Sequence, residues 1–233
     1  MSRILAALAW LALIAVPWLG PAVRPDAGTW VVALLTGRWA GTEPWVVVHF
    51  QLMGVWPMLL GLQLRRYWLA RPIPALPFCL ASFGIGAYGL LPWFVVRSRD
   101  APPRGTPRLD RALPLLAVGL GLTTLGLFGF GLVAGTPTAW LTAARTDGFV
   151  WTMAADFVVL WGTSMAIAQQ DGDRRWWWAL LPVLGTTGLL LKAPPPSAAE
   201  TTWPPPVHRH RGDAAASITN PFRSPDATSV WYA

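Results

Sequence analysis

Two long apolar runs, joined by a short arginine-bearing connection, constrain this chain more than any other feature. The runs occupy residues 45–64 and 74–96, and the connection carries Arg65, Arg66 and Arg71. At a rise of 1.5 Å per residue, a helix of about 20 residues crosses the roughly 30 Å hydrocarbon core of a bilayer. The pattern therefore predicts a transmembrane helical hairpin.

The composition supports a membrane protein. Hydrophobic residues make up 54% of the chain and charged residues 12%, whereas an average soluble domain carries about 25% charged residues. The net charge of +7 would suggest nucleic acid as a partner of a soluble protein. Most of the arginines, however, flank apolar runs, where phospholipid head groups account for them better. We therefore expect the lipid bilayer as the partner of the chain, and no nucleic acid.

The whole chain reads as an all-α, polytopic transmembrane helical bundle of about six helices. The expected spans are residues 4–20, 45–64, 74–96, 112–134, 149–168 and 176–191. A cleaved signal peptide is the alternative for the first span. The apolar patch at 29–35 is too short to span, and we expect an interfacial helix turn there. The distribution of arginines leaves the orientation in the membrane open.

Two domains follow from this division. Residues 1–191 form the transmembrane helical domain, which we expect to be multi-pass and integral to the membrane. Residues 192–233 are rich in proline and have no periodic apolar face. Such a segment cannot bury enough apolar surface to offset the entropy of ordering, so we expect a disordered tail.

Four sequence phrases carry a resemblance to a known family. Three of them read HFQLMGVWPMLLG, PALPF and SFGIGAYGLLPW, and the fourth is the pair Asp156 and Phe157. Together they resemble uncharacterised integral membrane proteins of cyanobacteria and plastids, over roughly residues 36–191. The resemblance implies a photosynthetic lineage and a thylakoid or bacterial plasma membrane. It implies no active-site residue, and the Pro-rich tail departs from the family pattern.

Asp156 is the sharpest candidate for a functional residue, because it falls well inside an apolar run. A carboxylate at such a depth costs about 2.5–3.5 kcal/mol on insertion scales, and such residues usually face a bundle interior. We expect Asp156 to face protein, with a hydroxyl of Ser82, Thr123 or Thr124 within hydrogen-bonding distance. One interpretation is a hydrogen-bonded acid that locks helices together, and the other is a residue on a transport path.

His49 is the one histidine that falls in a predicted helix. One hypothesis makes it an axial ligand to a chlorophyll or haem, because neutral imidazole is the commonest metal ligand of proteins. The alternative is an interfacial hydrogen bond beside Gln51. Chlorophyll or carotenoid are therefore the cofactors to consider. His208 and His210 supply at most two ligands, so we expect no metal site in the tail.

No motif in the sequence names a reaction. The glycines of SFGIGAYG have the spacing G-x-G-x-x-G, but they lie inside an apolar run rather than after a strand, so they do not predict a nucleotide site. There is no GxxxxGK loop, CxxC pair or HExxH motif in the chain. An enzyme is accordingly the least favoured class.

Two functional hypotheses remain. The first is a non-enzymatic structural, accessory or assembly component of a larger membrane complex, such as a photosynthetic one. It predicts no solvent cavity around Asp156. The second is a small transporter or proton-coupled carrier that uses Asp156, and it predicts a polar cavity reaching this residue from one side. An inverted internal repeat would support the second hypothesis, but none is visible in the sequence.

Overall fold

The computed structural model describes residues 1–97, 107–171 and 174–192. In this part of the chain every regular element is a helix, which confirms the all-α prediction. The predicted tail beyond residue 192 lies outside the described residues, as does most of the connection that follows residue 97.

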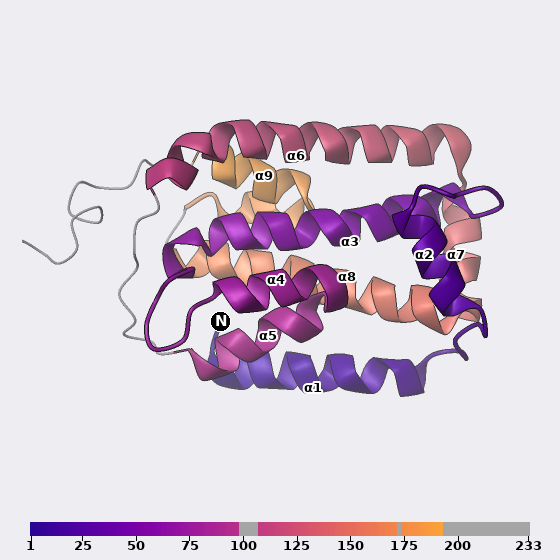
Figure 1. Cartoon of the computed structure of the whole chain (residues 1–233), viewed down its shortest axis with the longest axis horizontal. Helices are drawn as coiled ribbons and strands as arrows, with labels where there is room; N and C mark the ends of the chain where they lie inside the picture. Colours follow the sequence, from indigo (N-terminus) through magenta and orange to yellow (C-terminus); the bar gives the residue numbers. More distant parts are fainter. Residues whose placement is uncertain (98–106, 172–173, 193–233) are drawn as a thin grey trace, which may run out of the picture. The chain divides into compact units, whose positions relative to one another are not determined.

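Three helices of the described residues are long and apolar enough to cross a membrane. They are α3 (Pro44–Gln63), α6 (Pro107–Ala134) and α8 (Gly148–Gln170). A fourth apolar helix, α1 (Arg3–Leu19), has 17 residues and runs beside α8. The long axes of these four helices lie roughly along one direction (Figure 1). They correspond to the expected spans 4–20, 45–64, 112–134 and 149–168.

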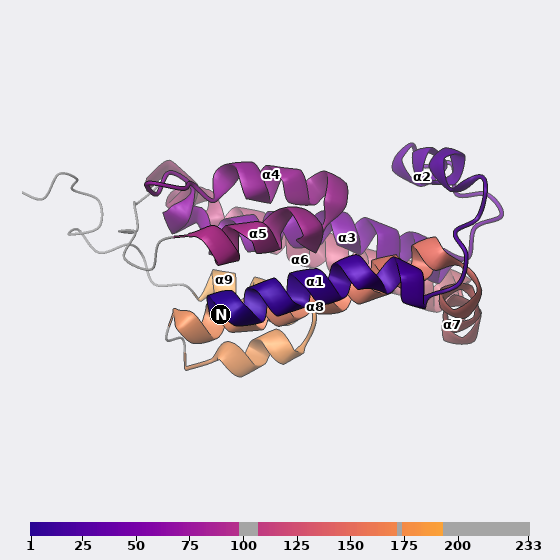
Figure 2. The ribbon, with the colours of Figure 1, turned by 90° about the horizontal axis from the view of Figure 1, so that it is seen from below.

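The expected span 74–96 is not one continuous helix, so the six-span scheme is not confirmed. It consists of α4 (Leu76–Ile85) and α5 (Ala87–Val96), separated by Gly86. Gly86 has φ +59°, a conformation that L residues rarely adopt, and α4 ends there. The chain then turns back, so that α5 returns beside α4 to the same end of the bundle (Figures 1 and 2). The length of this apolar run alone had predicted a helix that crosses the membrane.

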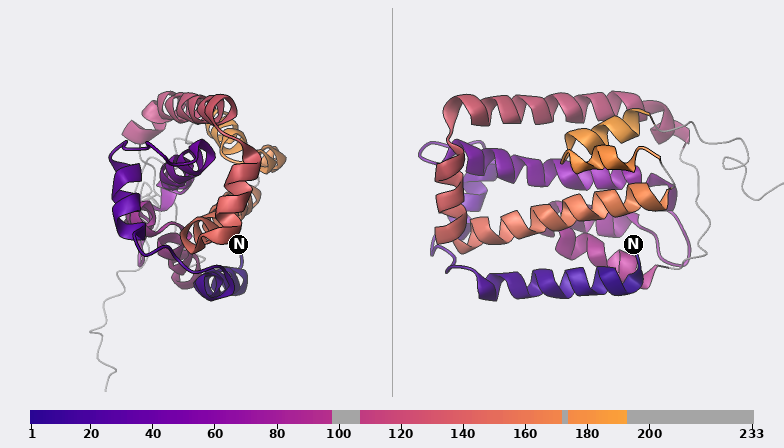
Figure 3. Two further views of the ribbon diagram at one scale, coloured as in Figure 1. Left: turned by 90° about the vertical axis from the view of Figure 1, so that its right-hand side faces the viewer. Right: turned by 180° about the vertical axis from the view of Figure 1, so that it is seen from behind.

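The expected span 176–191 is interrupted in the same way. It consists of a 3₁₀ helix, η2 (Trp176–Leu180), and α9 (Leu184–Leu191). Between them Val183 has φ +63°, and the Leu184 amide donates to the Pro182 carbonyl at 2.7 Å, which is the pattern of a γ-turn. This second hairpin therefore also turns back before it reaches the far end of the bundle (Figure 3).

We call the end of the bundle at which both hairpins enter and leave the hairpin bases. Two short helices lie at the opposite end. Helix α2 (Ala27–Leu35) matches the expected interfacial turn at 29–35. Helix α7 (Pro137–Thr146) fills a connection for which the sequence predicted no helix. Asp147 follows it, and the Asp147 carboxylate accepts from the Phe149 amide at 2.8 Å and so caps α8.

The order and direction of the elements repeat once along the chain. A long helix, a short helix, a returning long helix and a hairpin occur first as α1, α2, α3 and α4–α5, and then as α6, α7, α8 and η2–α9. Corresponding elements run in the same direction, and both hairpins enter from the same end (Figures 1 and 3). The structure thus contains two repeats of equal orientation, whereas the sequence analysis had looked for an inverted repeat.

The packing of the helices follows the same correspondence. Helix α1 packs on α5 as α6 packs on α9, and α3 packs on α6 as α8 packs on α1. Likewise α3 contacts α4 where α8 contacts η2, while α3 and α8 contact each other. Exchanging the halves therefore reproduces most of the contacts, as in an approximate twofold arrangement about the α3–α8 pair. The short helices depart from it, since α7 packs more closely on the bundle than α2 does.

One buried ion pair joins the halves near the hairpin bases. Arg65, in the 3₁₀ turn η1 (Arg65–Tyr67), donates from Nε to the Asp110 carboxylate of α6 at 2.5 Å. Both side chains are buried, with exposed fractions of 6% and 8%. Arg65 also donates to the Leu62 carbonyl at 3.2 Å. A charge pair so enclosed stabilises only when its hydrogen bonds are made, and these contacts supply them.

Candidate functional site

Asp156 lies on α8 and faces protein, as predicted, with 5% of its surface exposed. It comes eight residues after the first residue of α8, which corresponds to a depth of about 12 Å along the helix axis. Its Oδ1 accepts a hydrogen bond of 2.8 Å from the Ala87 amide. Ala87 is the first residue of α5, so the carboxylate lies at the turn of the first hairpin.

The position of the carboxylate follows from the break in the hairpin. The first amides of a helix have no carbonyl partner within it, and the aligned peptide dipoles make this end electropositive. No side chain of the hairpin itself caps α5. Asp156 fills this role from another helix, and the contact is a charge-assisted hydrogen bond when the carboxylate is ionised.

Gly86 makes the close approach of this carboxylate possible. A Cβ atom built on Gly86 would overlap the Asp156 carboxylate. The absence of a side chain at residue 86 therefore permits both the positive φ and the contact between the hairpin and α8. Any larger residue at position 86 would have to displace either the hairpin turn or the Asp156 carboxylate.

A cavity of about 330 Å³ reaches Asp156. It is lined by the last turn of α4, including Ser82, by α3 and α8, and by Val31 and Leu35 of α2. The Ser82 hydroxyl is buried and has no hydrogen-bond partner among the described residues. The Ser82 carbonyl, by contrast, accepts from the Gly86 amide at 2.8 Å. The residues that line the cavity therefore include a buried carboxylate, Asp156, and a hydroxyl without a partner, Ser82.

The expected hydroxyl partner of Asp156 was wrong, because the recorded donor is the Ala87 backbone amide. Ser82 shares the cavity with Asp156 but makes no hydrogen bond to it. Thr124 is buried, and its hydroxyl donates to the Leu120 carbonyl of its own helix at 2.8 Å. Thr123 similarly donates to Gly119. Both threonines lie on α6, which is not among the main packing partners of α8, so equal depth did not bring them to Asp156.

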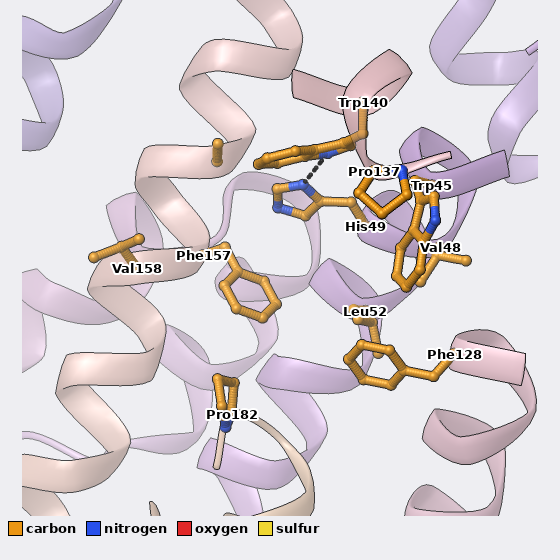
Figure 4. A pocket seen from close by; sticks show the side chains of 11 residues that line it. Trp45, Val48, His49, Leu52, Phe128, Pro137, Trp140, Phe157, Val158 and Pro182 are labelled. Carbon is orange, nitrogen blue, oxygen red and sulfur yellow. Dashed lines mark hydrogen bonds between the residues drawn. The ribbon is translucent and has the colours of Figure 1, made fainter. Parts of the chain in front are cut away.

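His49 is buried in a second pocket, with 8% of its surface exposed. Its Nδ1 accepts a hydrogen bond of 3.1 Å from Trp140 Nε1 of α7, drawn as a dashed line in Figure 4. The Phe157 ring packs edge-on against the imidazole at a centroid distance of 5.2 Å. Gln51 takes no part, because its amide donates to the Leu34 carbonyl at 3.2 Å. A hydrogen bond at His49 was predicted, but its partner was not.

The Trp140 bond fixes the tautomer of His49. An indole nitrogen can only donate, so Nδ1 of a neutral imidazole must carry the lone pair and Nε2 the hydrogen. An Nε2 that carries hydrogen has no lone pair for a metal. This geometry therefore disfavours His49 as the axial ligand of a chlorophyll or haem. The described residues also contain no cluster of three or more His, Cys, Asp or Glu side chains that could hold a metal ion.

His49 and Asp156 occupy corresponding places in the two repeats. His49 lies on α3 and Asp156 on α8, each is followed by a phenylalanine, and each lies in a cavity that includes a residue from the turn of one hairpin, Gly86 or Pro182. A comparison of the two halves of the sequence could have found this, since His49-Phe50 precedes an arginine pair much as Asp156-Phe157 does. The Gly86 break and Trp140 had no comparable signal.

Comparison with protein-family models, with curated proteins and with solved structures found no match to this chain.

Proposed function

We propose that this protein is a small membrane transporter that uses Asp156 to bind and release a proton. One observation carries the proposal: a buried carboxylate lies at the break of a helical hairpin and borders a cavity. Transporters of several folds bind coupling ions at interrupted helices that occur in corresponding positions of two repeats. The pair of hairpins in this chain has that arrangement. The cavity supports the transport hypothesis over the structural one, which predicted no solvent cavity around Asp156.

The proposed membrane arrangement has four crossing helices and two re-entrant hairpins. Helices α1, α3, α6 and α8 cross, and the shortest of them, α1, extends about 25 Å at 1.5 Å per residue. Each arm of the first hairpin has 10 residues and extends about 15 Å, which is half of a hydrocarbon core. Irregular backbone at this depth is tolerated where protein or a cavity surrounds it, as at Gly86.

This arrangement gives the chain an orientation. Basic residues of the described part gather at the end where α1 begins, namely Arg3, Arg65, Arg66, Arg71, Arg97, Arg111, Arg174, Arg175 and Lys192. At the other end lie only Arg24, Arg38 and Arg145 of these residues. Basic loops remain on the cytoplasmic side, so the hairpin bases face the cytoplasm in our proposal. The Asp156 cavity, which includes α2, then lies toward the opposite side.

The surroundings of Asp156 suit a group that changes its protonation state. The Ala87 amide and the electropositive end of α5 stabilise the ionised carboxylate, whereas burial in an apolar wall favours the neutral acid. The Ser82 hydroxyl lines the same cavity but makes no hydrogen bond to Asp156, so the Ala87 amide is the recorded partner of the carboxylate.

The test is proton binding measured directly. We would adsorb proteoliposomes of the full chain on a solid-supported membrane and record the transient current after a pH jump. Wild type should give a charge displacement above that of empty liposomes. Asp156→Asn should lose this displacement while its unfolding midpoint stays that of wild type. Asp26→Asn makes the same change in an exposed loop and should keep the current. An Asp156→Asn current equal to that of wild type would exclude the proposal.

A second candidate function is a structural or accessory component of a membrane complex. The hydrogen bond between Ala87 and Asp156 favours it, because this bond ties the first hairpin to α8 and so could serve only to hold the fold. In that case neither wild type nor any Asp156 variant gives a current above that of empty liposomes. The protein then also purifies from mild detergent with partner subunits. Membership of the cyanobacterial and plastid family remains a prediction of the sequence phrases alone.

A further inference from the structure

The pocket around His49 differs in character from the Asp156 cavity. It has a volume of about 420 Å³ and lies between α3, α6, α7 and α8, with Pro182 from the turn of the second hairpin. Aromatic rings form much of its wall, among them Trp140, Phe157 and Phe128 (Figure 4). Pockets of about 300–1,000 Å³ with apolar walls and few polar groups are typical of sites for small molecules.

His49 lines the pocket and carries one hydrogen-bond donor that has no acceptor among the described residues. Because Trp140 occupies Nδ1, the hydrogen of the neutral imidazole lies on Nε2. This nitrogen is buried and has no hydrogen-bond partner in the described part of the chain. The Met153 carbonyl of α8 interacts with the imidazole, but its geometry falls outside that of a hydrogen bond. A buried donor without a partner is costly, so an acceptor is expected from outside the chain.

The wall of the pocket reaches the outer surface of the bundle. Val158 lines the pocket and is 59% exposed, and it lies on the side of α8 that faces away from the core. In the proposed membrane arrangement this side of α8 faces acyl chains. A ligand that enters here comes from the lipid phase and must itself be lipophilic.

We propose that this pocket binds a planar lipophilic molecule with a carbonyl oxygen, such as the head group of a quinone. The carbonyl accepts from His49 Nε2, and the ring packs among Trp140, Phe157 and the neighbouring apolar side chains. Trp140 acts as a positioning residue, because it holds the imidazole in the donor tautomer. The pocket takes residues from both repeats, and the inference rests on the proposed membrane arrangement but not on the transport role of Asp156.

A matched pair of probes tests the carbonyl. We would measure the binding of 2-methyl-1,4-naphthoquinone and of 2-methylnaphthalene, which has the same ring system without oxygens, to the full chain in detergent micelles. Wild type should bind the quinone about tenfold more tightly, the ratio that corresponds to one hydrogen bond of about 1.4 kcal/mol. His49→Phe keeps a ring in the pocket and should reduce this ratio to about one.

Two further variants separate loss of the donor from loss of the fold. Ala154→Phe adds a ring to the wall of the pocket while His49 and Trp140 are unchanged, and it should weaken both probes. Leu122→Phe makes a similar change at an exposed position of α6 outside the pocket and should leave both affinities unchanged. If Ala154→Phe binds both probes as wild type does, the ligands bind elsewhere and the proposal is wrong.

A spectroscopic readout is independent of affinity. The chain has three histidines, so selective ¹⁵N labelling of histidine in a chain with His208→Gln and His210→Gln leaves His49 as the one signal. The quinone should shift the signal of a protonated Nε2, and 2-methylnaphthalene should not. The proposal would be overturned if wild type bound the two probes with equal affinity. It would also be overturned, in favour of a lipid-ester site, if added phosphatidylcholine displaced the quinone with an affinity equal to that of the quinone.

Discussion

Replacing Gly86 by alanine should destabilise the bundle by roughly 2.5–6 kcal/mol. Gly86 has φ +59° and ψ −139°, and holding a residue with a side chain in such a region costs of order 1–3 kcal/mol. The new Cβ would also overlap the Asp156 carboxylate and force it away from the Ala87 amide. Loss of a hydrogen bond to a charged group costs about 1.5–3 kcal/mol, which gives the sum.

The assay is reversible unfolding in mixed micelles, with the helical circular dichroism followed against the mole fraction of dodecyl sulfate. Gly84→Ala is the matched control, because a Cβ on Gly84 meets nothing within 4 Å. It should be neutral or stabilising by up to about 1 kcal/mol, since alanine favours a helix over glycine. If Gly86→Ala is no more destabilising than Gly84→Ala, the account of the hairpin turn is wrong.

A double-mutant cycle isolates the contact between the hairpin and α8. Asp156→Ala removes the carboxylate that the new Cβ would meet, so Gly86→Ala should cost less in this background than in the wild type. Contacting residues usually show coupling of about 0.5–3 kcal/mol, and we expect a value in the upper half of that range. Additive effects would mean that the carboxylate does not limit the space at Gly86.

Three other predictions concern stability. Arg65→Met should cost about 3–5 kcal/mol because it leaves the Asp110 carboxylate buried without its partner, whereas Arg65→Met with Asp110→Leu should recover most of this loss in the same unfolding assay. Trp140→Phe should cost about 1–3 kcal/mol by leaving the His49 acceptor unpaired, and it should have little effect in a His49→Phe background. Ending the chain after Lys192 should leave expression and the unfolding midpoint unchanged, because the segment removed contains little apolar surface to bury.

The sequence predicted the class of the fold because composition and the length of apolar runs report directly on helices in lipid. It also predicted that Asp156 is buried against protein, since a carboxylate inside an apolar helix must find a polar neighbour. Neither argument depends on knowing which helices are adjacent. The prediction of a hydroxyl partner for Asp156 did depend on which helices are adjacent. Depth alone selected Thr124, which lies on a helix that does not pack closely on α8.

The two hairpins could not be separated from crossing helices by hydrophobicity. Residues 74–96 are apolar throughout, and a half-length helix that turns back needs the same composition as one that crosses. The glycines of SFGIGAYG lie inside an apolar run and gave no signal of a break, but one of them, Gly86, is the turn itself. The second hairpin gave a weak signal, because residues 176–191 are barely long enough to span and contain Pro182.

The most direct test of the account is the side of the membrane on which the first hairpin begins and ends. We would introduce single cysteines at Arg38, Arg71 and Arg97 of a Cys79→Ala chain and label them with an impermeant maleimide in sealed and in opened vesicles. A re-entrant hairpin predicts that residues 71 and 97 are labelled from the same side and residue 38 from the other. If residue 97 is labelled together with residue 38, the segment crosses the bilayer, and the site at Asp156 cannot have the form described.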